Sequence, residues 1–91
     1  MAVLTQSEID FLLKENPEWK LDSGKLVRDW TFKDFQQAMA FANRIAEIAE
    51  SAGHHPDIDI RYNSVRLGLV SHDAGGITKR DAKMAARLNS V

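Results

Sequence analysis

The spacing of apolar residues changes along the chain, and each change predicts a new element. Ile9 and Leu12 recur at helical spacing, so we expect a first helix that ends near Asn16. Thr5 and Glu8 precede this run with the spacing of a capping box, in which a hydroxyl and a carboxylate bind the free backbone amides of a helix start. The N-terminal segment is therefore expected to be a capped helix.

Apolar and polar residues then alternate, which is typical of half-buried strands. Trp19–Asp22 and Lys25–Phe32 flank a short Ser-Gly pair and predict a first hairpin. From Asp34 the apolar period becomes helical again and continues to Gly53. Glycine takes the left-handed conformation without strain, and Pro56 does not continue a helix, so we expect the second helix to end at Gly53.

A second hairpin follows, with Asp57–Tyr62 and Val65–His72 as its strands. We expect a loop over Asp73–Ile77 and a last helix that begins at a Thr78 cap and continues to Leu88. The order α-β-β-α-β-β-α predicts an α+β fold, with a four-stranded antiparallel sheet and helices packed on one face. We expect residues 1–91 to form one domain.

Composition excludes several classes of function. The 91 residues suit one small domain, and 12 basic against 13 acidic side chains give a net charge of −1. Such a chain has no basic field for nucleic acid, so we expect no nucleic-acid partner. The absence of cysteine excludes thiol nucleophiles, disulfides and cysteine-ligated zinc, and it is consistent with a cytoplasmic protein. Polar residues interrupt the longest apolar stretch, so we expect neither a membrane span nor a cleaved leader.

The three histidines lie near the ends of the second hairpin. If Tyr62 pairs with Val65 across a two-residue loop, His55 stands opposite His72, and His54 is its chain neighbour. Sequence spacing therefore predicts that three imidazoles gather at one edge of the sheet. Histidine gives and takes protons near neutral pH, so this cluster indicates acid–base chemistry.

Other interpretations of the histidines remain open. They are also compatible with an ordinary loop corner, or with a zinc site that uses three imidazoles. Adjacent residues of an extended chain point to opposite sides, which makes His54 and His55 poor partners on one ion. Ser51 and Ser71 lie near them, but neither has the strand-turn-helix surroundings of a nucleophile elbow.

The histidines belong to a longer motif. It consists of Glu50-x-x-x-His54-His55-Pro56, Tyr62-Asn63-x-Val65, His72 and Gly76-x-Thr78-x-x-Asp81, with Trp19 and Phe32-x-Asp34-Phe35 outside that stretch. Together these residues resemble the signature of the pterin-4a-carbinolamine dehydratase family. The resemblance covers nearly the whole chain and is densest over residues 50–81.

The resemblance implies an enzyme that uses neither a metal nor an organic cofactor. Its substrate would be a 4a-hydroxytetrahydropterin, which loses water to give a quinonoid dihydropterin. His54 and His72 would be the acids, acting from opposite sides of the flat ring, and His55 would hold the pterin and serve as a base. Glu50 and Asp81 would orient imidazoles or bind the polar edge of the pterin.

The resemblance also implies a role for Pro56 and a set of partners. Pro56 would shape the substrate pocket. Similar proteins form homodimers or homotetramers, and they are linked to an aromatic amino acid hydroxylase whose oxidised pterin they help to regenerate. Two other functions remain open. One is a non-catalytic dimerisation or regulatory module, and the other is a related enzyme that acts on a different pterin.

Overall fold

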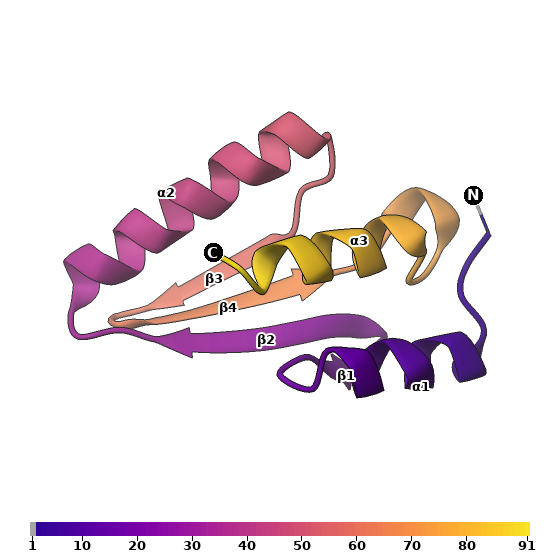
Figure 1. Ribbon diagram of the computed structural model, residues 1–91. Helices are drawn as coiled ribbons and strands as arrows, with labels where there is room; N and C mark the ends of the chain where they lie inside the picture. Colours follow the sequence, from indigo (N-terminus) through magenta and orange to yellow (C-terminus); the bar gives the residue numbers. More distant parts are fainter. Residues whose placement is uncertain (1) are drawn as a thin grey trace.

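The computed structural model describes residues 2–91 and contains the predicted order of helices and strands (Figure 1). Position 1, with which the expected domain begins, lies outside the described residues. The elements are α1 (Gln6–Glu15), β1 (Lys20–Asp22), β2 (Lys25–Thr31), α2 (Phe35–Ala52), β3 (Asp57–Arg61), β4 (Ser64–Leu69), the 3-10 helix η1 (His72–Ala74) and α3 (Lys79–Leu88).

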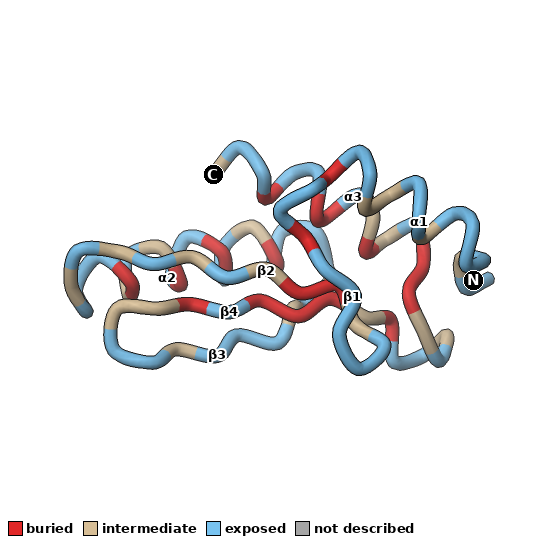
Figure 2. The backbone as a smooth tube through the Cα atoms, turned by 90° about the horizontal axis from the view of Figure 1, so that it is seen from below, coloured by how far each residue is buried: buried red, intermediate tan, exposed pale blue. Residues whose placement is uncertain are grey.

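The four strands form one antiparallel sheet in the order β1-β2-β4-β3. The helices lie on one side of this sheet, and the other side is open (Figures 1 and 2). This arrangement confirms the predicted α+β fold. No helix among residues 2–91 is long and apolar enough to cross a membrane.

The core lies between the sheet and the helices. Alternate residues of β4, namely Val65, Leu67 and Leu69, are fully buried, and Ile45 of α2 packs in the same cluster. Burying side chains of this size stabilises the fold by about 1.5–3 kcal/mol each. Because β4 is a central strand, the segments that leave its two ends begin from a rigid platform.

The predicted register of the second hairpin is wrong by two residues. Arg61 pairs with Ser64, so Tyr62 and Asn63 form the turn, and Tyr62 takes a positive φ of 55°. The reason is a contact with the residue that follows β2: the Asn63 side-chain amide donates to the Phe32 carbonyl at 2.9 Å, and the Phe32 N–H donates to the Asn63 carbonyl at 2.8 Å. With this register, His55 is not opposite His72.

The predicted end of the fourth strand is also wrong. β4 ends at Leu69, and His72 begins the helix η1, where it is exposed. Ser71 makes an isolated bridge with Gly76, and the Ser71 carbonyl accepts from the N–H of Gly75 at 3.0 Å. The chain therefore folds back on itself after β4, and this turn carries His72 out of the sheet.

Capping boxes begin both terminal helices, as predicted. At α1, Glu8 accepts from the Thr5 N–H at 2.8 Å, and this backbone hydrogen bond lowers the pKa of Glu8 from its ordinary value. At α3, Asp81 accepts from the Thr78 N–H at 2.9 Å, but here the carboxylate is fully buried. The same Asp81 oxygen accepts from the Ser71 hydroxyl at 2.9 Å. The second box therefore ties η1 to α3 as well as capping a helix.

We predict that the two boxes differ in their contribution to stability. Asp81→Ala should lower the free energy of unfolding by about 3–5 kcal/mol, because it leaves buried donors without an acceptor. Glu8→Ala removes the same contact at the surface and should cost far less. Denaturant unfolding followed by circular dichroism measures the free energy of unfolding of both variants. Equal losses in the two variants would contradict our explanation that burial makes the Asp81 contact more stabilising. The Glu8 contribution is present above pH 4.5 and should disappear as the pH falls through its lowered pKa.

Candidate active site

His54 is positioned by the end of α2. Gly53 takes the left-handed conformation with a φ of 66°, as predicted for the helix cap. The N–H of Gly53 donates to the Glu50 carbonyl, and the N–H of His54 donates to the Ala49 carbonyl, each at 3.2 Å. These bonds close the last turn and direct the chain toward β3. The backbone of His54 is therefore fixed by helix termination.

The imidazole of His54 binds the buried carboxylate of Asp81. Nε2 of His54 lies 2.6 Å from Oδ1 of Asp81, and the two side chains are 12% and 0% exposed. The other oxygen of Asp81 accepts from Ser71 and from the Thr78 N–H, which suits an ionised carboxylate, and an ionised carboxylate acts only as an acceptor. Nε2 of His54 therefore donates, which leaves Nδ1 free to exchange a proton.

His55 pairs with a different carboxylate in a different environment. Its Nε2 lies 2.8 Å from Oε2 of Glu50, with side chains that are 63% and 82% exposed. Water screens an exposed pair, so this contact restrains His55 weakly. Pro56 follows directly and is half-buried. The two carboxylates named from the sequence thus each contact one imidazole. Asp81 binds His54 in a buried pair, and Glu50 binds His55 in an exposed pair.

His72 is connected to the same part of the structure through its neighbours. Ser71 donates to Asp81, and Asp73 forms an ion pair with Arg80. The hydrogen bond from Arg80 holds the pKa of Asp73 below its usual value. Two consecutive residues of α3 therefore anchor the turn that carries His72. Among residues 2–91, no hydrogen bond joins one imidazole to another, and the register that would have set His55 opposite His72 does not form.

A cavity of about 250 Å³ lies beside His54, between the end of α2 and one face of α3. Binding sites for small molecules are concave and contain a few polar groups in a mainly apolar lining. This cavity combines an imidazole with apolar and cationic side chains, so it is a candidate for substrate contact. Its lining residues are Ala52, His54, Arg80, Lys83, Met84 and Arg87.

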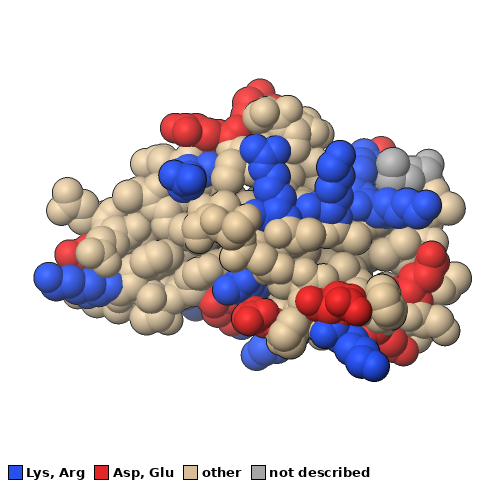
Figure 3. Space-filling model, viewed as in Figure 1, with Lys and Arg blue, Asp and Glu red and all other residues tan. Residues whose placement is uncertain are grey.

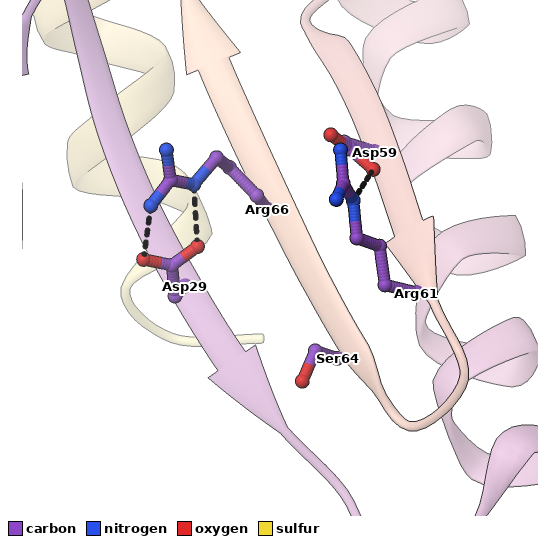
Figure 4. A pocket seen from close by; sticks show the side chains of 5 residues that line it. All are labelled: Asp29, Asp59, Arg61, Ser64 and Arg66. Atoms are coloured by element: carbon purple, nitrogen blue, oxygen red, sulfur yellow. Dashed lines mark hydrogen bonds and ion pairs between the residues drawn. The ribbon is translucent and has the colours of Figure 1, made fainter.

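The open face of the sheet carries a second cavity of about 350 Å³, but its charged groups neutralise one another (Figure 4). Arg66 binds both oxygens of Asp29, at 2.8 and 3.1 Å, and Arg61 binds Asp59 at 3.2 Å. The hydrogen bond from Arg66 lowers the pKa of Asp29. No histidine lines this cavity, so acid–base chemistry is better supported at His54.

Three alternatives from the sequence can be compared with this geometry. Among residues 2–91, no three side chains of the His, Cys, Asp and Glu types gather as a set of metal ligands. Ser71 is 1% exposed and its hydroxyl donates to Asp81, so it serves the capping network and is not an accessible nucleophile. Ser51 is exposed in the last turn of α2.

Sequence reasoning missed the contribution of Arg80. Neither the contact of Arg80 with Asp73 nor the hydrogen bond from Ser71 to Asp81 was predicted from the sequence. One feature of the sequence could have indicated that Arg80 belongs to the site. Arg80, Lys83 and Arg87 are three and four residues apart on a predicted helix, and residues at this spacing share a face.

Comparisons with known proteins identify the family. The model of the family described as pterin 4 alpha carbinolamine dehydratase matches residues 2–91. A relative from Acidobacterium capsulatum is 55% identical over 91 residues, which is 100% of this chain and 99% of the relative. One from Thermomicrobium roseum is 54% identical over 88 residues, covering 97% and 95%. Both carry the name pterin-4-alpha-carbinolamine dehydratase as a provisional assignment.

Solved structures agree with this result. The crystal structure of a transcriptional coactivator/pterin dehydratase from Brucella melitensis matches with a TM-score of 0.88 and 36% identity, over 97% of this chain and 96% of that one. A pterin dehydratase-like protein described as a RuBisCO assembly factor in the alpha-carboxysome has a TM-score of 0.62 at 23% identity, over 79% and 83%, and shares the fold. With a family model over residues 2–91 and full-length relatives above 50% identity, this chain belongs to the pterin 4 alpha carbinolamine dehydratase family.

Proposed function

We propose that this protein is a hydro-lyase that removes water from a 4a-hydroxytetrahydropterin and releases the quinonoid dihydropterin. The observation that carries the proposal is the buried Asp81–His54 pair beside a cavity, in a chain of the dehydratase family. An imidazole whose Nε2–H is held by a carboxylate keeps Nδ1 for proton transfer. This is the group that elimination of water needs.

The chemistry requires one acid and one base. Hydroxide is a poor leaving group, so an acid first protonates the hydroxyl on C4a. The C4a–O bond then breaks as the lone pair of N5 forms a C4a–N5 double bond, and a base removes the hydrogen from N5. One water molecule leaves and no atom is oxidised or reduced in net terms. We therefore propose that the reaction uses neither a metal nor an organic cofactor.

We propose the following division of roles. His54 and His72 are the acids for the two faces of the pterin ring, and His55 holds the ring and accepts the N5 proton. Asp81 is a positioning residue for His54, supported by their contact at 2.6 Å. Glu50 positions His55 more loosely because their pair is exposed. Pro56 shapes the pocket.

We also propose a physiological context. The quinonoid product must be reduced before reuse, and an aromatic amino acid hydroxylase is the kind of enzyme that generates the 4a-hydroxy substrate. A cytoplasmic location is consistent with this role. A homodimer or homotetramer is the expected assembly, since β1 and β3 are the outer strands of an open sheet.

The first test is catalysis itself. We expect stopped-flow absorbance to show faster formation of the quinonoid product from fresh 4a-hydroxytetrahydropterin, with a chelator present. His54→Ala and His72→Ala should each slow turnover by roughly 10- to 10,000-fold, because each removes an acid–base group. Arg61→Ala is the matched control, since this side chain is 83% exposed on the open face of the sheet.

Wild-type turnover in both histidine variants would contradict the assigned roles. A folded wild-type protein without any acceleration would contradict the enzyme and favour a binding module. Acceleration limited to pterins other than the biopterin type would favour the alternative substrate.

A second test separates the two carboxylates. Asp81→Asn should lower kcat by roughly 10- to 10,000-fold with a smaller change in KM, because the amide no longer holds the imidazole in its reactive form. Glu50→Gln should change kcat much less, since its pair with His55 is exposed and screened.

Ser71→Ala is the control for a purely structural effect. It removes one hydrogen bond to Asp81 and leaves the contact with His54 in place. It should lower stability without a comparable loss of kcat. A loss of kcat that follows melting temperature across the three variants would contradict a positioning role for Asp81.

A further inference from the structure

The cavity beside His54 has an unusual balance of charge. We call it the α3 groove and define it by its lining residues Ala52, His54, Arg80, Lys83, Met84 and Arg87. Three of these six side chains are cationic, and no carboxylate is among them. Arg80 anchors the turn that carries His72 through Asp73, but acid–base catalysis by the histidines gives no role to Lys83 or Arg87, so these two cations call for a separate explanation.

The cations form a stripe on one face of α3. Arg80, Lys83 and Arg87 are three and four residues apart, a spacing that places side chains on the same side of a helix. Figure 3 shows basic side chains in a band over α3, with most of the acidic side chains in that view above and below it. Like charges four residues apart on a helix repel each other, so the stripe carries a cost in stability.

Little inside the chain offsets this repulsion. Among residues 2–91, Lys83 and Arg87 form no ion pair, and Arg80 uses one guanidinium nitrogen for Asp73. The Nε of Arg80 is enclosed without a hydrogen-bond acceptor. Glu47 lies along a second hollow, which Arg87 also lines and His54 does not. The positive charge of the stripe is therefore not neutralised by any carboxylate that lines the α3 groove.

We propose that the α3 groove binds an anionic side chain of the substrate, so that the enzyme prefers pterins whose side chain ends in a phosphate or a carboxylate. This inference rests on the proposed function, because the pterin ring must lie against His54. The anion then lies along α3, where Lys83 and Arg87 are about 4.5 and 10.5 Å beyond Arg80 at 1.5 Å rise per residue. Arg87 can bind either anion through two parallel hydrogen bonds.

The size of the groove limits the class of ligand. A cavity of about 250 Å³ accommodates a small anionic group and does not accommodate a polymer. The net charge of −1 likewise provides no extended basic field for nucleic acid. A small anionic tail on the substrate is the ligand that agrees with both the charge and the size.

The test compares three stable dihydropterins that differ only in whether the side chain ends in a phosphate, a carboxylate or a hydroxyl. Isothermal titration calorimetry should show roughly 10- to 100-fold tighter binding of the anionic probes, the range expected for one or two charge-assisted hydrogen bonds. The phosphate and carboxylate arms identify which anion is preferred. The preference should weaken as salt concentration rises.

The double variant Lys83→Gln/Arg87→Gln should bind the three probes with similar affinity. Lys79→Gln is the matched control: it removes one charge from the same helix, and Lys79, like Lys83, lines the hollow between α1 and α3, but it does not line the α3 groove. This control should keep the preference for anionic probes.

Two results would overturn the inference, and they are distinguishable. Equal binding of anionic and neutral probes by the wild type, or a preference that survives in the double variant, would overturn it and leave the dehydratase proposal intact. Failure of the folded wild type to bind any of the three pterins would overturn the dehydratase proposal and this inference with it.

Discussion

The buried carboxylate of Asp81 connects the parts of the chain on which the candidate site depends. One oxygen accepts from the Thr78 N–H and from the Ser71 hydroxyl, and the other accepts from His54. A fully buried carboxylate is strongly destabilising without such partners, so its three donors must be present together. The start of α3, the turn before His72 and the imidazole of His54 are therefore held by one group.

Burial distinguishes the two pairs of histidine and carboxylate. His54 and Asp81 are shielded from water, and their contact keeps a defined geometry. His55 and Glu50 are mostly exposed, and water competes with their hydrogen bond. A histidine paired with a carboxylate thus gives a rigid group in one place and an adaptable group in the other. A reactive imidazole benefits from the first environment, and one that adjusts to a ligand benefits from the second.

Charge is also distributed differently on the two faces of the molecule. On the open face of the sheet, Arg66 and Asp29 pair across neighbouring strands, and Lys25 of β2 pairs with Asp57 of β3 across β4, which lies between them. These cations are neutralised within the chain. Along the α3 groove, Lys83 has no such partner among the described residues. For this reason we interpret the α3 groove, and not the open face of the sheet, as an anion-binding surface.

Much of the fold follows from local patterns in the sequence. The capping-box spacings at Thr5 and Thr78 predicted where α1 and α3 begin, and Gly53 predicted where α2 ends. These signals are reliable because they depend on contacts within three or four residues. The family signature likewise identified Asp81 and the three histidines as candidate residues before any geometry was known.

Only the tertiary structure decided how those residues are arranged. The register of the second hairpin depends on Asn63 reaching Phe32, the residue after β2, which is 31 positions away. The place of His72 depends on a turn that Ser71 makes with Gly76 and secures through Asp81. The sequence by itself therefore determined the elements and the candidate chemistry, which arise from local spacing. The pairing of His54 with the buried Asp81 arises from a contact between segments 27 residues apart, and periodicity carries no information about burial or about such contacts.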